Sequence, residues 1–321
     1  DGTMFASGTR SVGRVQLWNL LTGENIWTDY SIGGWVWAVA FTPDGKHVWA
    51  CGETQCVALE CDPQHHVADT MPIRDLSQDC GQYVKFSPDA SRLIISSRLI
   101  KKTPEGKISI GQDGYFMVYD LSSKEMLFKK DVFIPCSIMD SQNRILCGNS
   151  FLDRTGPTTL WNQTADKELA SFQGIPQATV ALALSADEEY LAAGQYTDHV
   201  TVWDFNKQPS TRILDCALSK SPPLMTFLTS VAISPDHRLL AIGGFFTGTS
   251  SANVPRYAEC GIDLWDLEKE EQIATFSGHN DGITYLEFTP DGRHLVSAGG
   301  DSMVRVWCVS EEDNTTAKPA E

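Results

Sequence analysis

The sequence has no long apolar run and little positive charge. None of its hydrophobic stretches approaches the ~18–20 residues that a membrane-spanning helix needs. Against 41 aspartates and glutamates there are 25 lysines and arginines, so the net charge is −16 over 321 residues. Phosphate binding requires a basic surface, and anionic membranes attract basic segments. We therefore expect no nucleic acid and no membrane span.

Signatures of the common catalytic and metal sites are also missing. The sequence contains no GxxxxGKS/T phosphate loop, no GxSxG elbow and no His-Glu-x-x-His motif. Its nine cysteines are odd in number and lack the close pairing of a zinc site. Cys51, Cys56 and Cys147 fall at small strand positions, where a free cysteine behaves as a hydrophobe. We expect no cofactor and no metal, and free thiols in a reducing cytoplasm.

The most regular stretch of the sequence spans residues 278–307. Two alternating apolar and polar runs, ITYLEF and HLVSA, are joined by the turn residues Thr289-Pro290-Asp291-Gly292, and a third run, MVRVW, follows Gly300-Asp301. Short alternating runs separated by turn residues are typical of antiparallel strands. This stretch is therefore predicted to form a three-stranded meander.

The same pattern recurs along the chain at a period of about 42 residues, with two longer intervals. Each repeat closes on an aromatic or apolar residue: Trp18, Leu59, Tyr119, Trp161, Trp203, Trp265 and Trp307. Five repeats carry a related turn, which begins at Thr42, Ser87, Ser185, Ser234 and Thr289. Seven positions in phase predict seven copies of one unit.

These units resemble the tryptophan–aspartate (WD) repeat, on account of Gly278-His279, Trp203-Asp204 and Trp265-Asp266. The resemblance implies an all-β fold, a seven-bladed β-propeller built of four-stranded antiparallel blades. We expect residues 1–310 to form one such domain. Residues 311–321 lack apolar alternation and are expected to be a disordered tail.

The first and last blades are expected to be incomplete. The sequence starts at the second strand of one blade and ends after the third strand of another. WD propellers close when an N-terminal segment supplies the last outer strand, so we expect the native chain to extend upstream of Asp1. Donation of the strand by another chain is the alternative, because an open sheet edge invites strand addition.

His279, Ser297, Asp301 and Trp307 could suggest a hydrolase triad with an aromatic neighbour. The resemblance instead implies a structural tetrad, in which histidine bonds aspartate and serine links histidine to the tryptophan N–H. A catalytic nucleophile should also lie exposed beside an oxyanion hole. We expect these residues to hold the fold, and His65-His66 to lie in a solvated turn.

The repeats differ most in the segments between their second and third strands. Those segments are longest at 98–114 and 245–260, and the resemblance places them on the same face as the connections between blades. Aromatic and arginine residues are enriched at interface hot spots. The candidate partner-binding residues are Arg98, Lys101, Lys102, Lys107, Phe245, Phe246, Arg256 and Tyr257 in these loops, and Tyr30 and Trp35 between blades.

The function expected is non-catalytic, that of a scaffold, a complex subunit or a recognition domain for one or more proteins. A partner that is acidic near Lys101 and Lys102 would suit the basic cluster. One alternative is a propeller enzyme with a site at the channel mouth, lactonase-like or quinoprotein-like. Such a site needs several converging His, Asp or Glu residues, and the sequence shows no evident partner for His199 or His237. Another alternative is a sensor domain of a larger signalling protein.

Overall fold

The structure is a computed structural model. It describes residues 2–9, 12–52, 55–64, 66–72, 79–102, 108–130, 136–148, 157–174, 177–195, 199–206, 211–215, 225–247 and 260–309, with side chains omitted for the strand segments 79–83, 97–102, 108–114, 211–215, 225–227 and 245–247. Within these ranges the chain is all-β, and no helix there is long and apolar enough to cross a membrane. It divides into two compact units, Asp1–Asp153 with Thr158–Ser171, and Arg154–Pro157 with Phe172–Glu321.

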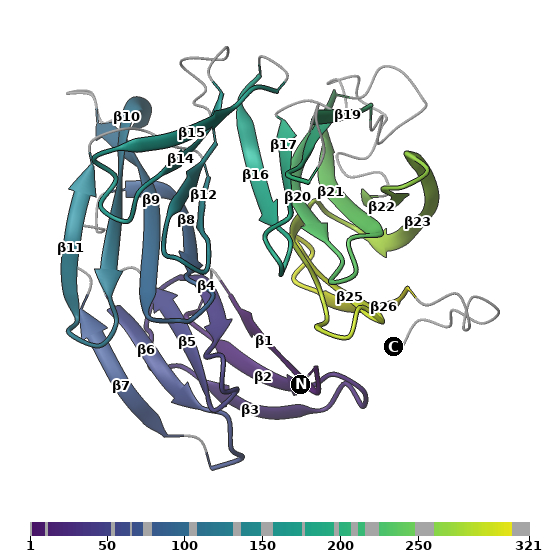
Figure 1. Cartoon of the computed structure of the whole chain (residues 1–321). Coiled ribbons are helices and arrows are strands. Elements are labelled where there is room, and N and C mark those ends of the chain that lie inside the picture. Colours follow the sequence, from purple (N-terminus) through teal and green to yellow (C-terminus); the bar gives the residue numbers. More distant parts are fainter. Residues whose placement is uncertain are drawn as a thin grey trace. The chain divides into compact units, whose positions relative to one another are not determined.

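The first unit holds four antiparallel sheets, seen from purple to teal in Figure 1. The first sheet has three strands and the others have four. In order, the sheets comprise β1 Met4–Gly8, β2 Val15–Asn19, β3 Asn25–Asp29; β4 Val36–Phe41, β5 His47–Gly52, β6 Gln55–Glu60, β7 Val67–Pro72; β8 Asp79–Phe86, β9 Arg92–Lys102, β10 Ile108–Asp120, β11 Glu125–Lys130; and β12 Ser137–Met139, β13 Ile145–Cys147, β14 Thr158–Trp161, β15 Glu168–Phe172.

The second unit holds three antiparallel sheets, from teal to yellow in Figure 1. Two have four strands and the last has three. They comprise β16 Thr179–Leu184, β17 Tyr190–Gln195, β18 His199–Asp204, β19 Thr211–Asp215; β20 Met225–Ile233, β21 Leu239–Thr247, β22 Cys260–Asp266, β23 Glu271–His279; and β24 Ile283–Phe288, β25 His294–Gly299, β26 Val304–Cys308. Seven successive antiparallel sheets are the blades of a seven-bladed β-propeller, which confirms the predicted fold class.

Most strands begin and end where the repeat pattern predicts. In the fifth blade the central strands β17 and β18 pair from Tyr190↔Asp204 to Gly194↔Val200, so the closing Trp203 lies opposite Leu191. Both residues are buried, and because successive side chains of a strand point to opposite faces, these two cross-strand partners lie on the same face of the sheet. The first and last sheets have the three strands that the sequence assigned to them.

The predicted turn recurs as one hydrogen-bonded unit between the first and second strands of five blades. A Ser or Thr hydroxyl donates to the carboxylate of the Asp two residues later, at 2.5 to 2.6 Å. That carboxylate accepts a backbone N–H from two residues further on, which satisfies a donor that the tight turn would leave unpaired. The five pairs are Thr42–Asp44, Ser87–Asp89, Ser185–Asp187, Ser234–Asp236 and Thr289–Asp291.

These hydrogen bonds favour the ionised form of the turn aspartates. The Thr42 hydroxyl, followed by the Lys46 N–H, holds the pKa of Asp44 below its ordinary value. At the turn after a third strand, the Ser122 hydroxyl and the Ser123 N–H lower the pKa of Asp120 to about 2. The carboxylates therefore bind protons less readily in the folded chain than in the unfolded chain.

Stability is expected to fall in acid because of these aspartates. A group whose pKa is lowered by folding stabilises the folded state above its unfolded pKa of about 3.9, and the contribution is lost as pH falls through the folded pKa. We expect the urea midpoint to stay nearly constant from pH 7 to about pH 5 and to decline between there and pH 2. The double variant Thr42→Val, Thr289→Val should show a shallower decline. A midpoint that already falls between pH 7 and pH 5 would contradict this account.

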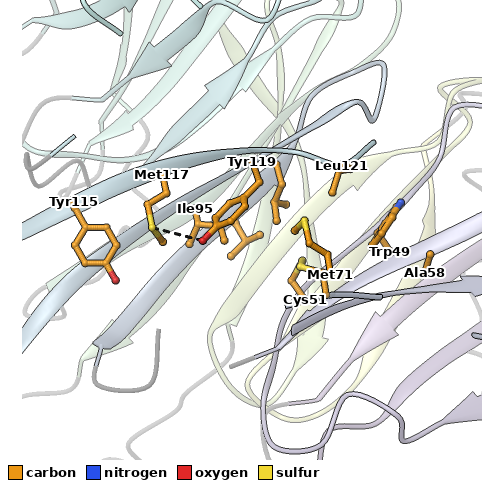
Figure 2. Packing of buried hydrophobic residues seen from close by; sticks show 12 residues of the cluster. Trp49, Cys51, Ala58, Met71, Ile95, Tyr115, Met117, Tyr119 and Leu121 are labelled. Carbon is orange, nitrogen blue, oxygen red and sulfur yellow. Dashed lines mark hydrogen bonds between the residues drawn. A yellow bond between two sulfur atoms is a disulfide. The ribbon is translucent and has the colours of Figure 1, made fainter. Parts of the chain in front are cut away.

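The apolar core lies between successive blades. Figure 2 shows the cluster that joins the second and third blades, where Met71 and Cys51 approach Tyr119 and Leu121. All are nearly inaccessible to solvent. Burial of such side chains contributes about 25 cal/mol per Å² of apolar surface, so packing between these blades stabilises the fold.

Cys51 and Cys56 form a disulfide between β5 and β6, where they are directly opposite partners. The expectation that both are free thiols was therefore wrong. Their places on the two strands looked like small apolar positions from sequence, since the strand pairing that brings them together was not considered. The disulfide also removes part of the basis for expecting a reducing cytoplasm. Cys61 and Cys147 are free thiols.

The segments expected to be loops at 98–114 and 245–260 are in part strand. β9 continues to Lys102 and β10 starts at Ile108, with Lys102 opposite Ile108. Similarly, β21 continues to Thr247, opposite Met225. Alternating residues such as Ile108-Ser109-Ile110 extend the pairing beyond the repeat length, which the fixed period did not anticipate.

Candidate functional site

His279, Ser297, Asp301 and Trp307 form one continuous chain of hydrogen bonds. The Trp307 Nε1–H donates to Ser297 Oγ at 2.8 Å, and Ser297 Oγ lies 2.8 Å from His279 Nε2. The His279 Nδ1 lies 3.0 Å from both carboxylate oxygens of Asp301. Every polar atom of the chain is satisfied if Ser297 donates to Nε2 and Nδ1–H donates to Asp301.

The tetrad joins two blades. His279 ends β23 of the sixth blade, while Ser297 and Trp307 lie on β25 and β26 of the seventh. Burial opposes ionisation of Asp301, but the Asn280 N–H, the His279 ring and the Met303 N–H hold its pKa below the ordinary value. The serine is fully buried and bonded on both sides. The expected exposure of a catalytic nucleophile is not met by this hydroxyl, and a structural role for the four residues stays a prediction.

Other blades satisfy the tryptophan N–H in simpler ways. Trp18 donates to Ser7 Oγ at 3.0 Å, Trp161 to Thr159 Oγ1 at 2.8 Å, and Trp203 to the backbone carbonyl of Gln173 at 3.1 Å. The buried Trp265 Nε1 has no acceptor among the residues that the structure describes. In the blades of Trp18, Trp161 and Trp203, a single hydrogen bond therefore takes the place of the four-residue chain.

The candidate basic and aromatic residues of the long hairpins lie on extended strands or outside the described residues. Arg98, Lys101 and Lys102 are on β9, opposite Gly114, Ser109 and Ile108 of β10. Phe245 and Phe246 are on β21, opposite Phe227 and Thr226 of β20. Lys107, Arg256 and Tyr257 fall outside the described residues. A partner-binding role for these eight residues stays a prediction.

Tyr30 and Trp35 lie in the connection between β3 and β4, where both are exposed. The Trp35 ring meets the ring of Trp37 edge-on, with centroids 5.4 Å apart. Asp29 Oδ1 accepts the Ser31 N–H at 2.7 Å and so fixes the start of the connection. The structure thus presents two large aromatic side chains on an ordered segment.

Val12 and Arg14 belong to the same neighbourhood, although sequence reasoning did not single them out. They flank Gly13 in the connection between β1 and β2, and a Cβ on Gly13 would lie 2.7 Å from the Gly34 carbonyl oxygen. The Val36 N–H also donates to the Thr9 carbonyl at 3.0 Å. In the sequence, this contact is signalled by the short connection between β1 and β2 and by the glycine within it.

A further hairpin, between β5 and β6, also contacts the Tyr30–Trp35 connection. Gln55 Nε2 donates to the Ser31 carbonyl at 3.1 Å, and a Cβ on Gly52 would lie 2.5 Å from Ile32 Cγ2 and 3.1 Å from the Trp35 carbonyl. Gly52 and Gln55 directly adjoin the disulfide-bonded cysteines of β5 and β6. The disulfide therefore fastens the end of the hairpin that contacts the aromatic connection.

His237 does have a partner, in contrast to what the sequence suggested. Its Nε2 lies 2.9 Å from Asp187 Oδ2, across equivalent turns of the fifth and sixth blades, and its ring stacks on Tyr190. Ligand atoms of Asp187, Glu189 and His237 lie within 4.8 Å of one another, a spacing that could hold a metal ion. Both carboxylates are exposed, and the ion pair accounts for the arrangement without a metal.

Comparison with known sequences points to one family. The profile of the WD domain, G-beta repeat, matches residues 270–308. The chain is 29% identical over 151 residues to an uncharacterized WD repeat-containing protein of Synechocystis sp., which covers 47% of this chain and 36% of that protein. It is 30% identical over 131 residues to Protein groucho of Drosophila melanogaster, covering 41% of this chain and 16% of that protein.

A further relative is WD repeat-containing protein 36 of Homo sapiens, 26% identical over 210 residues that cover 62% of this chain and 21% of that protein. The matches thus span well under half the length of these relatives. Members of this family are generally non-catalytic scaffolds. Residues 270–308 thus match the WD repeat, and the chain as a whole, with its seven antiparallel sheets, is similar to WD-repeat proteins.

Proposed function

We propose that this chain is a non-catalytic interaction scaffold, and that it binds a protein partner through a surface centred on Tyr30 and Trp35. Their exposure is the observation that carries the proposal. Side-chain burial is the usual state of large aromatic residues, yet Tyr30 is 60% and Trp35 is 45% exposed. Tyrosine and tryptophan are enriched among the residues that dominate interface energetics.

The connection that carries these residues is ordered before any partner binds. It contacts Gly13 of one hairpin and both Gly52 and Gln55 of another. Because a preordered surface loses little conformational freedom on association, such contacts favour binding. The net charge of −16 supports a protein partner over nucleic acid. Cytoplasmic location and the part played by Lys101 and Lys102 stay predictions.

Loss of the two aromatic side chains is expected to abolish binding of the native partner. The wild-type chain and the Tyr30→Ala, Trp35→Ala variant would be used to capture partners from the source organism, with cross-linking and mass spectrometry. We expect a stoichiometric protein whose cross-links lie near residues 30–35, and its loss in the variant. Leu21→Ala is the control, since Leu21 is 76% exposed but lies in the turn between β2 and β3. Equal capture by the variant would contradict the proposed surface.

A further inference from the structure

The surface around Tyr30 and Trp35 includes an apolar residue and a cation from a second connection. Val12 is 57% exposed, and Arg14 is two residues further along. The backbones of the two connections meet at Gly13 and Gly34, both of which have positive φ, 65° and 78°. Glycine tolerates this conformation, and its missing side chain permits the close approach. We define Val12, Arg14, Tyr30 and Trp35 as the arginine–aromatic surface.

Arg14 is the unusual member of this surface. Its Nε atom is buried and has no hydrogen-bond acceptor within the described part of the chain. No carboxylate of the described residues forms an ion pair with it, although acidic residues outnumber basic ones, 41 to 25. A guanidinium is an always-charged planar donor that matches a carboxylate in geometry. A partly buried cation without an acceptor is stabilised more by binding a carboxylate than a fully solvated lysine is.

The apolar members determine the rest of the ligand chemistry. Tyr30, Trp35 and Val12 expose apolar surface on the two connections that meet next to Arg14, so a matching ligand carries a bulky apolar side chain near its carboxylate. A basic ligand would place like charge against Arg14. Nucleic acid also offers anions, but the −16 net charge of the chain would repel its extended phosphate backbone.

We propose that the arginine–aromatic surface binds an acidic peptide segment of the partner. In this arrangement an Asp or Glu carboxylate accepts hydrogen bonds from the Arg14 guanidinium, and a neighbouring apolar side chain packs on Tyr30 and Trp35. This inference rests on the proposed function, because it names the partner chemistry of the same surface. Arg14 would supply orientation and specificity, while the aromatic rings would supply most of the buried area.

The probe is a random library of 12-residue peptides displayed on phage and selected on the immobilised full chain. The best binder would be synthesised with a fluorescein label, alongside a version with its acidic residues changed to lysine. Binding is then followed by fluorescence anisotropy. We expect selected sequences rich in Asp or Glu beside Leu, Phe or Trp, and no binding of the lysine version.

Arg14→Glu is expected to weaken binding of the selected peptide by at least about 10- to 100-fold, which is the range for loss of a hydrogen-bonded charge pair. The affinity of Arg14→Lys for the peptide should lie between the affinities of Arg14→Glu and the wild type. The positive charge remains, but the planar guanidinium that can bond both carboxylate oxygens is lost. Leu21→Ala is the matched control and should bind as the wild type does. Circular dichroism of each variant would establish that it is folded.

The outcomes separate this inference from the proposed function. If selected peptides are basic or neutral, or are insensitive to Arg14→Glu yet lost with Tyr30→Ala, Trp35→Ala, the acidic-segment inference is overturned while the surface stands. If binders are insensitive to all these variants, or no binder is selected, both proposals fail. Acidic binders lost in Arg14→Glu and retained in Leu21→Ala would support both.

Discussion

Replacement of Ser297 by alanine is expected to lower the free energy of unfolding by about 2–3 kcal/mol. The Ser297 oxygen accepts the Trp307 N–H and bonds His279 Nε2, each at 2.8 Å. Its removal leaves two polar atoms without partners in a place that water cannot readily reach, and each orphaned group costs about 1–3 kcal/mol. The partly exposed Trp307 indole would contribute at the low end of that range.

Urea unfolding followed by circular dichroism measures this loss. Tyr285→Phe is a suitable control, since it removes a hydroxyl that bonds the exposed Glu287 within the same sheet. We expect that control to change stability by less than about 0.5 kcal/mol, as is usual for surface positions. If Ser297→Ala is as stable as Tyr285→Phe, the tetrad does not stabilise the junction between the sixth and seventh blades.

Trp203→Ala and Trp35→Ala are expected to have opposite consequences, although both delete the same side chain. Trp203 is only 2% exposed, packs near Phe172 and donates to the Gln173 carbonyl. Its loss should destabilise the chain by about 3–5 kcal/mol, which combines lost transfer energy with the cavity that remains. Trp35→Ala removes an exposed ring and one edge contact with Trp37, so the stability loss should be about 1 kcal/mol or less.

Binding is expected to show the reverse order. Trp35→Ala should weaken partner or peptide binding strongly, since Trp35 would be an interface anchor. Trp203→Ala, assayed at a temperature where circular dichroism shows it folded, should bind nearly as the wild type does. A stability loss for Trp35→Ala equal to that for Trp203→Ala would mean that Trp35 is a core residue, and would remove the basis of the proposed surface.

Much of the fold follows from local sequence, because each blade repeats one period. The period alone assigns Leu59 to the last position of the second repeat, which lacks a Trp-Asp pair. Leu59 occurs in β6, opposite Val48. Strand alternation and turn chemistry depend on residues close together in the chain, so they can be recognised in the amino-acid sequence. They determine the strand order within each blade.

What the sequence did not reveal depends on contacts between strands or between blades. The Cys51–Cys56 disulfide requires the register of β5 against β6. The His237–Asp187 pair requires two turns from successive blades to meet. Arg14 became a candidate only when the contact of Gly13 with Gly34 was known. The extension of β9 to Lys102 was hidden by the assumption of a fixed period.

The polar tetrad has a consequence for how such chains diverge and are recognised. Hydrogen-bonded side chains tolerate few replacements, whereas Leu, Ile, Val and Met interchange in a core at small cost. The family profile matches residues 270–308, the stretch that contains all four tetrad residues, although the chain has seven blades. Blades held by apolar packing can lose the recognisable sequence motif while they retain the fold. The number of repeats recognised by sequence is therefore a lower bound on the number of blades.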